Sequence, residues 1–309
     1  RLFQRNINPP GVAGDGFAMA YRAGAALTNM EFIQVGPGVV YPNIRFIIHS
    51  HMWRFVPTIT NRNGDRFLPE YCPPDVTYDE VLDLKAMSYP FSVRTDSKYL
   101  DISIFKEMLA GRGTAHGGVC FDVTHIAREE LKAKAPITYE TFLSQGVDLA
   151  TDKIEIAPVV QSFNGGVKID ENGASSVPGL YCAGEVSGGV HGADRPGGNN
   201  LIDCQVFGYR AGQSAAREAA GSSCTCKMRG IRLEEREYSE GDTSLLSDLC
   251  RLYYRNLTIV RTEEGIKEVL TRIDELKEQI FSTQHFSKHI ALANALIVGE
   301  IVAESALIR

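Results

Sequence analysis

The chain has 309 residues and a formal net charge of −6 at pH 7, from 32 basic and 38 acidic side chains. This length accommodates about two domains, and the mild acidity excludes the basic patch that nucleic acid or an anionic membrane surface requires. The cysteines are seven, an odd number scattered along the chain, which indicates reduced thiols rather than a disulfide framework. These properties predict a globular protein of cytoplasmic localisation that binds no nucleic acid.

The first part of the chain, residues 1–30, predicts an extended entry and then a helix. Pro9 and Pro10 disfavour helix at the start, and Gly14-Asp15-Gly16 opens a helical stretch of small residues over 17–27. A strand is expected over residues 31–40.

Residues 31–157 are rich in turn signals and are expected to form an inserted domain of mixed α and β structure. Asn63-Gly64-Asp65 is typical of a tight turn. A helix is expected over residues 99–109, ending at Gly111.

Residues 158–222 contain the densest chemical signal. A short apolar strand is expected over 179–183, followed by residues 184–198 with six glycines and by a helix over 199–220. The order strand, glycine loop, helix favours a ligand at the carboxyl end of the strand, with the amides of the helix N-terminus facing it.

The last part, residues 223–309, carries apolar positions at helical spacing and predicts a helical bundle. Its most apolar stretch is interrupted by Glu300 and Glu304, which favours a buried core helix and predicts no transmembrane segment. Cys224 and Cys226 lack a second pair of ligands nearby, so no metal site is predicted.

The glycine loop holds the side chains that bind ligands. Glu185 can accept hydrogen bonds from hydroxyl groups, and Arg195 can hold a carboxylate through two parallel hydrogen bonds. Glycine has no Cβ, so the backbone around these side chains can approach a ligand closely.

Two stretches resemble a known family. Residues 179–185 read GLYCAGE and residues 191–201 read HGADRPGGNNL, which resembles the C-terminal FAD motif of the fumarate reductase/succinate dehydrogenase flavoproteins. Residues 14–25, GDGFAMAYRAGA, followed by MEFIQ at 30–34, resemble a second motif of that family.

The resemblance implies an α/β fold with an added α part. Residues 1–30 and 158–222 would form the C-terminal part of a FAD-binding Rossmann-like domain. Residues 31–157 would form an inserted α+β capping domain, and 223–309 a C-terminal helical bundle.

The resemblance also implies site residues. Asp15 would contact FAD, Glu185 would bind its ribityl hydroxyls, and Asn200 and Leu201 would lie at the isoalloxazine ring. Arg195 would bind a substrate carboxylate.

The chain also departs from the family pattern. No G-x-G-x-x-G phosphate loop precedes Gly14, so the pyrophosphate and adenosine sites are expected to need another segment or polypeptide. Gly36 and Gln161 stand where the family has two substrate-binding histidines.

The proton donor is therefore open. Ser97 matches the position of the family's proton-donating arginine, with Lys98 beside it, and Arg94 could serve if the spacing differs. His116 is a second candidate acid near neutral pH, the alternative being a role in a surface loop.

These features predict a FAD-dependent oxidoreductase acting on CH–CH bonds, with hydride transfer at flavin N5 to or from an activated C–C bond. Its substrate is expected to be a small molecule other than free fumarate. The alternatives are a true fumarate reductase or succinate dehydrogenase flavoprotein subunit, and a non-catalytic flavin electron-transfer subunit of a redox complex. The expected partner is an electron-donor or electron-acceptor protein subunit.

Overall fold

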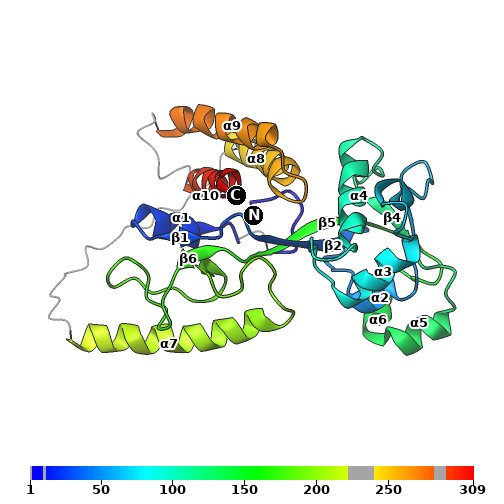
Figure 1. Ribbon diagram of the computed structural model, residues 1–309, viewed down its shortest axis with the longest axis horizontal. Coiled ribbons are helices and arrows are strands. Elements are labelled where there is room, and N and C mark those ends of the chain that lie inside the picture. Colours follow the sequence, from blue (N-terminus) through cyan, green and yellow to red (C-terminus); the bar gives the residue numbers. More distant parts are fainter. Residues whose placement is uncertain (1, 10–11, 222–239, 282–289) are drawn as a thin grey trace. The chain divides into compact units, whose positions relative to one another are not determined.

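The computed structural model describes residues 2–9, 12–221, 240–281 and 290–309 (Figure 1). The chain forms two compact units. The glycine-loop unit comprises Arg1–Gln4, Asn8–Ile33 and Ser162–Arg309, and the inserted unit comprises Arg5–Ile7 and Gln34–Gln161. The predicted Cys224–Cys226 pair and the predicted start of the last helix at 286–289 lie outside the described residues.

The glycine-loop unit is built on a sheet of three short strands, β1 (Leu27–Thr28), β6 (Gly166–Lys168) and β7 (Ser187–Gly188), in the order β1-β6-β7. Strands β1 and β6 are antiparallel, whereas β6 and β7 are parallel. A Cβ atom on Gly188 would lie 2.3 Å from the backbone nitrogen of Gly166. Glycine is therefore required where these two segments meet.

Helices cover this sheet. The first, α1 (Asp15–Arg22), follows Gly14, whose positive φ of 81° suits glycine. It is shorter than the helix expected over 17–27, because the chain turns at Gly24 with a φ of 87°. The long α7 (Asn199–Gly221) agrees with the predicted helix.

The strand expected over residues 179–183 was wrong. This segment forms only an isolated bridge between Tyr181 and Ala174, followed by the short 3-10 turn η2 (Gly184–Val186). The Cys182 amide donates to the Gly173 carbonyl, so the segment pairs with its own preceding turn and does not join the sheet.

The inserted unit contains a four-stranded sheet in the order β2-β5-β4-β3, namely β2 (Ile33–Tyr41), β5 (Ile154–Phe163), β4 (Val119–Asp122) and β3 (Thr58–Thr60). Its core combines sheet residues such as Phe121 and Ile156 with the fully buried Trp53. The mixed helix and sheet content predicted from the sequence is confirmed. The helices are α2 (Ser50–Trp53), η1 (Leu68–Tyr71), α3 (Tyr78–Met87), α4 (Lys98–Leu109), α5 (Arg128–Lys134) and α6 (Pro136–Ser144).

Helices α3 and α4 are joined by an ion pair inside the inserted unit. Lys85 Nζ lies 2.5 Å from Asp101 Oδ2, and both side chains are fully buried. Burial lowers the pKa of Lys85 and raises that of Asp101, while each charge opposes the effect on the other. Removing one partner would leave the other charge uncompensated in the core.

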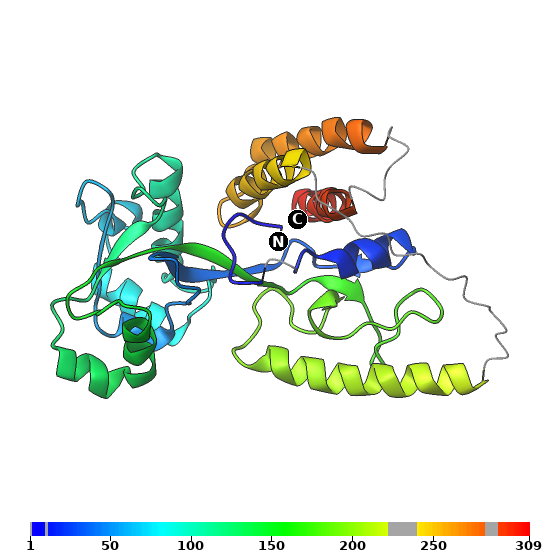
Figure 2. The ribbon, with the colours of Figure 1, turned by 180° about the vertical axis from the view of Figure 1, so that it is seen from behind.

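The C-terminal part forms three helices, α8 (Glu240–Leu257), α9 (Glu263–Phe281) and α10 (Ile290–Ile308), which pack together and, through α10, on α1 (Figures 1 and 2). Within the described ranges, α10 is the one helix long and apolar enough to cross a membrane. Its packing against α1, α8 and α9 accounts for this composition.

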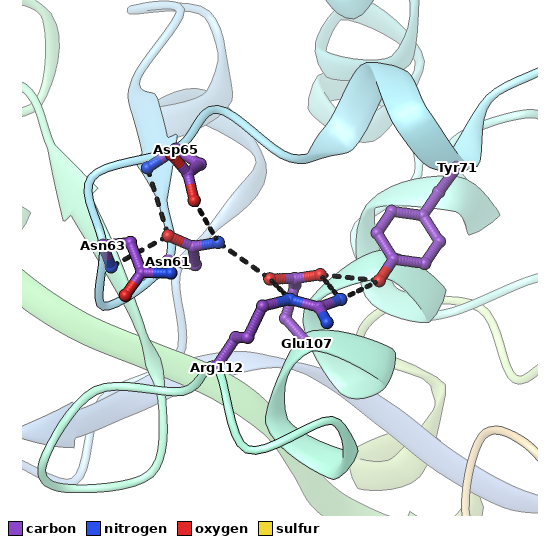
Figure 3. A network of polar contacts seen from close by, with 6 residues as sticks. All are labelled: Asn61, Asn63, Asp65, Tyr71, Glu107 and Arg112. Atoms are coloured by element: carbon purple, nitrogen blue, oxygen red, sulfur yellow. Dashed lines mark hydrogen bonds and ion pairs between the residues drawn. The ribbon is translucent and has the colours of Figure 1, made fainter.

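A polar network fixes the end of α4 in the inserted unit (Figure 3). Glu107 is 1% exposed and accepts hydrogen bonds from Arg112 Nη2 at 2.5 Å, Tyr71 Oη at 2.6 Å and Asn61 Nδ2 at 3.0 Å. The hydrogen bond from Arg112 is the largest cause that lowers the pKa of Glu107 from 4.5 to about 2, against the opposing effect of burial. Arg112, which the sequence places between two glycines, therefore has a structural partner.

This network predicts a pH-dependent stability. Since the pKa of Glu107 is depressed in the folded state, its contribution is present above pH 4.5 and is lost as the pH falls toward about 2. Glu107→Gln should lower the free energy of unfolding near neutral pH by about 2–3 kcal/mol and flatten its decline between pH 6 and 3, measured by urea unfolding. Glu130→Gln, at an exposed pair with Lys134, is the matched control and should change little. Equal pH dependence in the wild type and Glu107→Gln would contradict the assignment.

Candidate functional site

The candidate site surrounds the glycine loop between η2 and α7. Gly184, Gly189, Gly192 and Gly198 have positive φ angles between 63° and 92°. A Cβ atom at Gly192, Gly197 or Gly198 would meet no atom within 4 Å. The space next to these glycines is open, so a ligand can approach the backbone there.

Glu185 lies at the start of this loop. One carboxylate oxygen, Oε1, accepts a hydrogen bond of 2.9 Å from the Phe163 amide. Partial desolvation raises the pKa of Glu185, while the Phe163 hydrogen bond and the charge of Arg195 oppose the rise. The side chain is exposed, so this fixed carboxylate can still accept hydrogen bonds from hydroxyl groups of a ligand.

Arg195 lies farther along the loop and is only 6% exposed. Burial lowers the pKa of its guanidinium, and the negative charges of Glu185 and Asp203 counteract this. A buried guanidinium with two neighbouring carboxylates is held charged and can bind a further anionic oxygen.

Asp203, in the first part of α7, is a residue that the sequence reasoning missed. It is 7% exposed, and its Oδ2 lies 3.5 Å from Nε2 of His191. Burial raises the pKa of Asp203, against the lowering effects of His191 and Arg195. An acidic residue soon after the helix start that follows the glycine loop was the signal that could have found it.

The structure places the other predicted cofactor residues at two helix starts. Asp15 is the first residue of α1, and its Oδ1 accepts a hydrogen bond of 2.6 Å from Asn294 Nδ2. The same amide accepts through Oδ1 from Arg22 at 2.6 Å. Asn200 and Leu201 lie in the first turn of α7, and Leu201 is 71% exposed.

The predicted acids Lys98 and His116 lie in the inserted unit. Lys98 Nζ bonds to Asp96 at 3.2 Å. His116 Nδ1 lies 2.8 Å from Glu155 Oε1, and its ring stacks on Tyr41 with 3.8 Å between the ring centroids. These contacts are local to the inserted unit, so the catalytic roles of Lys98 and His116 stay predictions.

The neighbouring candidates differ from each other. Ser97 is fully buried and its hydroxyl bonds to that of Thr95 at 2.8 Å, whereas Arg94 is exposed. Ser97 is therefore held in the core of the inserted unit and cannot reach solvent.

The two positions that lack histidine also have defined surroundings. A Cβ atom at Gly36 would lie 2.8 Å from the hydroxyl oxygen of Tyr89, so the tyrosine fills the space that a side chain would need. At Gln161 the amide oxygen is buried with no hydrogen-bond partner among the described residues. In the same part of the chain, no group of three or more His, Cys, Asp or Glu side chains could hold a metal ion.

Comparisons with known proteins agree with this site. A family model described as FAD binding domain matches residues 2–201. The flavoprotein-like relative from Methanothermobacter marburgensis, named as a fumarate reductase (CoM/CoB), is 35% identical over 96% of this chain and 54% of its own length. L-aspartate oxidase of Pseudomonas aeruginosa is 29% identical over 100% of this chain and 56% of its own.

A solved structure agrees as well. Mycobacterium smegmatis Sdh1 in complex with UQ1 superimposes with a TM-score of 0.78 and 32% identity, covering 100% of this chain and 53% of that one. The chain belongs to the FAD binding domain family, within the fumarate reductase/succinate dehydrogenase flavoproteins. This confirms the resemblance and the cofactor, FAD. The chain spans about half the length of the curated relatives it matches.

The residues present fit FAD. The open backbone at Gly192, Gly197 and Gly198 leaves room for a ligand, and Glu185 offers a fixed acceptor for ribityl hydroxyls. The N-terminus of the long helix α7 follows directly and favours negative charge on a bound group.

This arrangement predicts that Glu185 contributes to FAD affinity. In the full-length protein, Glu185→Ala should weaken FAD binding by about 1–3 kcal/mol, the range for a lost charged hydrogen bond. Glu264→Ala, at an exposed position in α9, is the matched control and should leave affinity unchanged. Flavin fluorescence titration measures both, and equal affinities would show that Glu185 does not contact the cofactor.

Proposed function

We propose that the complete protein is a FAD-dependent oxidoreductase that reduces or oxidises a carbon–carbon bond next to a carbonyl or carboxyl group. When bound, FAD supplies hydride transfer at its N5 atom. The chain would belong to the C-terminal part of a Rossmann-like FAD-binding domain with a capping domain over 31–157. The observation that carries the proposal is the buried Arg195 in the glycine loop of a chain that matches a FAD-binding family.

Arg195 is proposed to bind and orient the substrate. Its planar guanidinium offers two parallel N–H groups to a carboxylate or carbonyl oxygen, which fixes the reacting carbon relative to the cofactor. Burial strengthens this interaction, since few water molecules compete for the guanidinium. Lys98 and His116 are the proposed proton donors, and the inserted unit would exclude water from the site.

The substrate is proposed to carry one carboxyl, carbonyl or thioester group rather than the two carboxylates of free fumarate. Position 36 has no room for a histidine while Tyr89 lies against it, and Gln161 offers a neutral amide in place of an imidazole. A second carboxylate therefore lacks a cationic partner at either position.

Two relatives favour different chemistry. One is named a fumarate reductase and another an L-aspartate oxidase, and L-aspartate would be oxidised at a carbon–nitrogen bond. A true fumarate reductase or succinate dehydrogenase subunit is thus one alternative, and a non-catalytic electron-transfer subunit is another. An electron-transferring protein partner and a cytoplasmic localisation belong to the same proposal.

An assay separates these cases. Full-length, FAD-loaded protein is reduced with dithionite and mixed with crotonate, a crotonyl thioester or fumarate, and the oxidised protein is mixed with succinate or L-aspartate and a dye. Faster turnover of crotonate or its thioester supports the proposal. Faster turnover of fumarate, succinate or L-aspartate contradicts the proposed substrate class. Flavin reoxidation only by a protein partner supports the non-catalytic subunit.

Arg195 gives the sharpest prediction of this proposal. Arg195→Lys should lower kcat/KM for the best substrate about 100-fold with normal FAD content, because a point charge does not reproduce the planar fork. Arg217→Lys, on the exposed part of α7, should leave turnover unchanged. Rapid, saturable fumarate turnover that survives Arg195→Lys would refute both the role of Arg195 and the substrate class.

A further inference from the structure

The loop that carries Arg195 needs tethers, because its glycines allow the backbone many conformations. One tether is the side chain of Asn164, whose Nδ2 donates to the Ala193 carbonyl at 3.0 Å. Another is the hydroxyl of Ser187, which donates to the Gly184 carbonyl at 2.7 Å. Both lie on the N-terminal side of Arg195, so neither fixes the segment between Arg195 and α7.

Asp203 is unusual within α7. Of the residues in this helix, only Asp203 and Ala211 are buried. An aspartate is rarely buried unless a partner compensates its charge. The burial of Asp203 in a helix that is otherwise largely exposed therefore points to a role in the loop that covers it.

The partner is on the other side of Arg195. The His191 and Asp203 side chains are 11% and 5% exposed, and the contact between Nε2 and Oδ2 is 3.5 Å. It joins the chain before Arg195 to the chain after it and closes the segment that contains the guanidinium. Asp203 also lies close enough to Arg195 for each charge to favour ionisation of the other.

We infer that Asp203 is a positioning residue, which holds the glycine loop through His191 and fixes the guanidinium of Arg195 for its ligand. This rests on the proposed function of Arg195 as the substrate anchor. A neutral side chain of equal size at 203 preserves the packing. It leaves the buried guanidinium with Glu185 as its remaining compensating carboxylate in the described site, so the loop opens and Arg195 turns toward solvent.

The test measures exposure of Arg195 directly. Full-length, FAD-loaded protein is treated with 2,3-butanedione, which modifies accessible guanidinium groups, and the rate at Arg195 is read by peptide mass spectrometry. Asp203→Asn should raise this rate about tenfold, the change expected from easier local opening, with FAD content and melting temperature unchanged. The matched control is Asp248→Asn, which alters an exposed aspartate paired with Arg251 and should not affect Arg195.

Two further measurements complete the test. With the best substrate from the panel above, Asp203→Asn should raise KM about tenfold and change kcat little, the signature of a loosened anchor. Asp203→Glu keeps the charge and should restore protection of Arg195 at least in part. An unchanged modification rate in Asp203→Asn overturns the inference. So does a loss of folding in Asp203→Asn that Asp203→Glu shares, since the role is then packing. If no substrate is turned over, the proposed function fails while the modification rates still decide this inference.

Discussion

The candidate site depends on one electrostatic constraint, the compensation of a buried guanidinium. A charge removed from water is costly unless opposite charges and hydrogen bonds replace the solvent. The glycine loop has little side-chain material of its own for this purpose, so the compensating carboxylates come from its two flanks. Glu185 stands at its beginning and Asp203 just beyond its end, which ties η2, the loop and α7 to the position of Arg195.

Local chemistry made much of the fold predictable. The helix expected over 199–220 agrees with α7, and the helix ending at Gly111 agrees with α4, because glycine and helical spacing mark both. The strand expected over 179–183 failed because an apolar run becomes a strand only where a neighbour offers free backbone groups. Here the Cys182 amide is taken by the turn that contains Gly173.

The site shows the same division between local and distant information. Glu185 and Arg195 were identified because their motif is continuous in sequence. The partner of Asp15 was not, since Asn294 is 279 positions away and only the packing of α10 on α1 brings the two together. Asp203 was visible in the sequence, but a helix predicts its exposed and buried faces only when the neighbouring loop is known.

The contact between Gly36 and Tyr89 constrains how such a protein can change during evolution. A Cβ atom at position 36 collides with the tyrosine hydroxyl, so a histidine introduced there first would be selected against in this background. Loss of the aromatic ring must come before or together with that change. The two positions are therefore epistatic, and the accessible mutational route between the two kinds of pocket runs through residue 89.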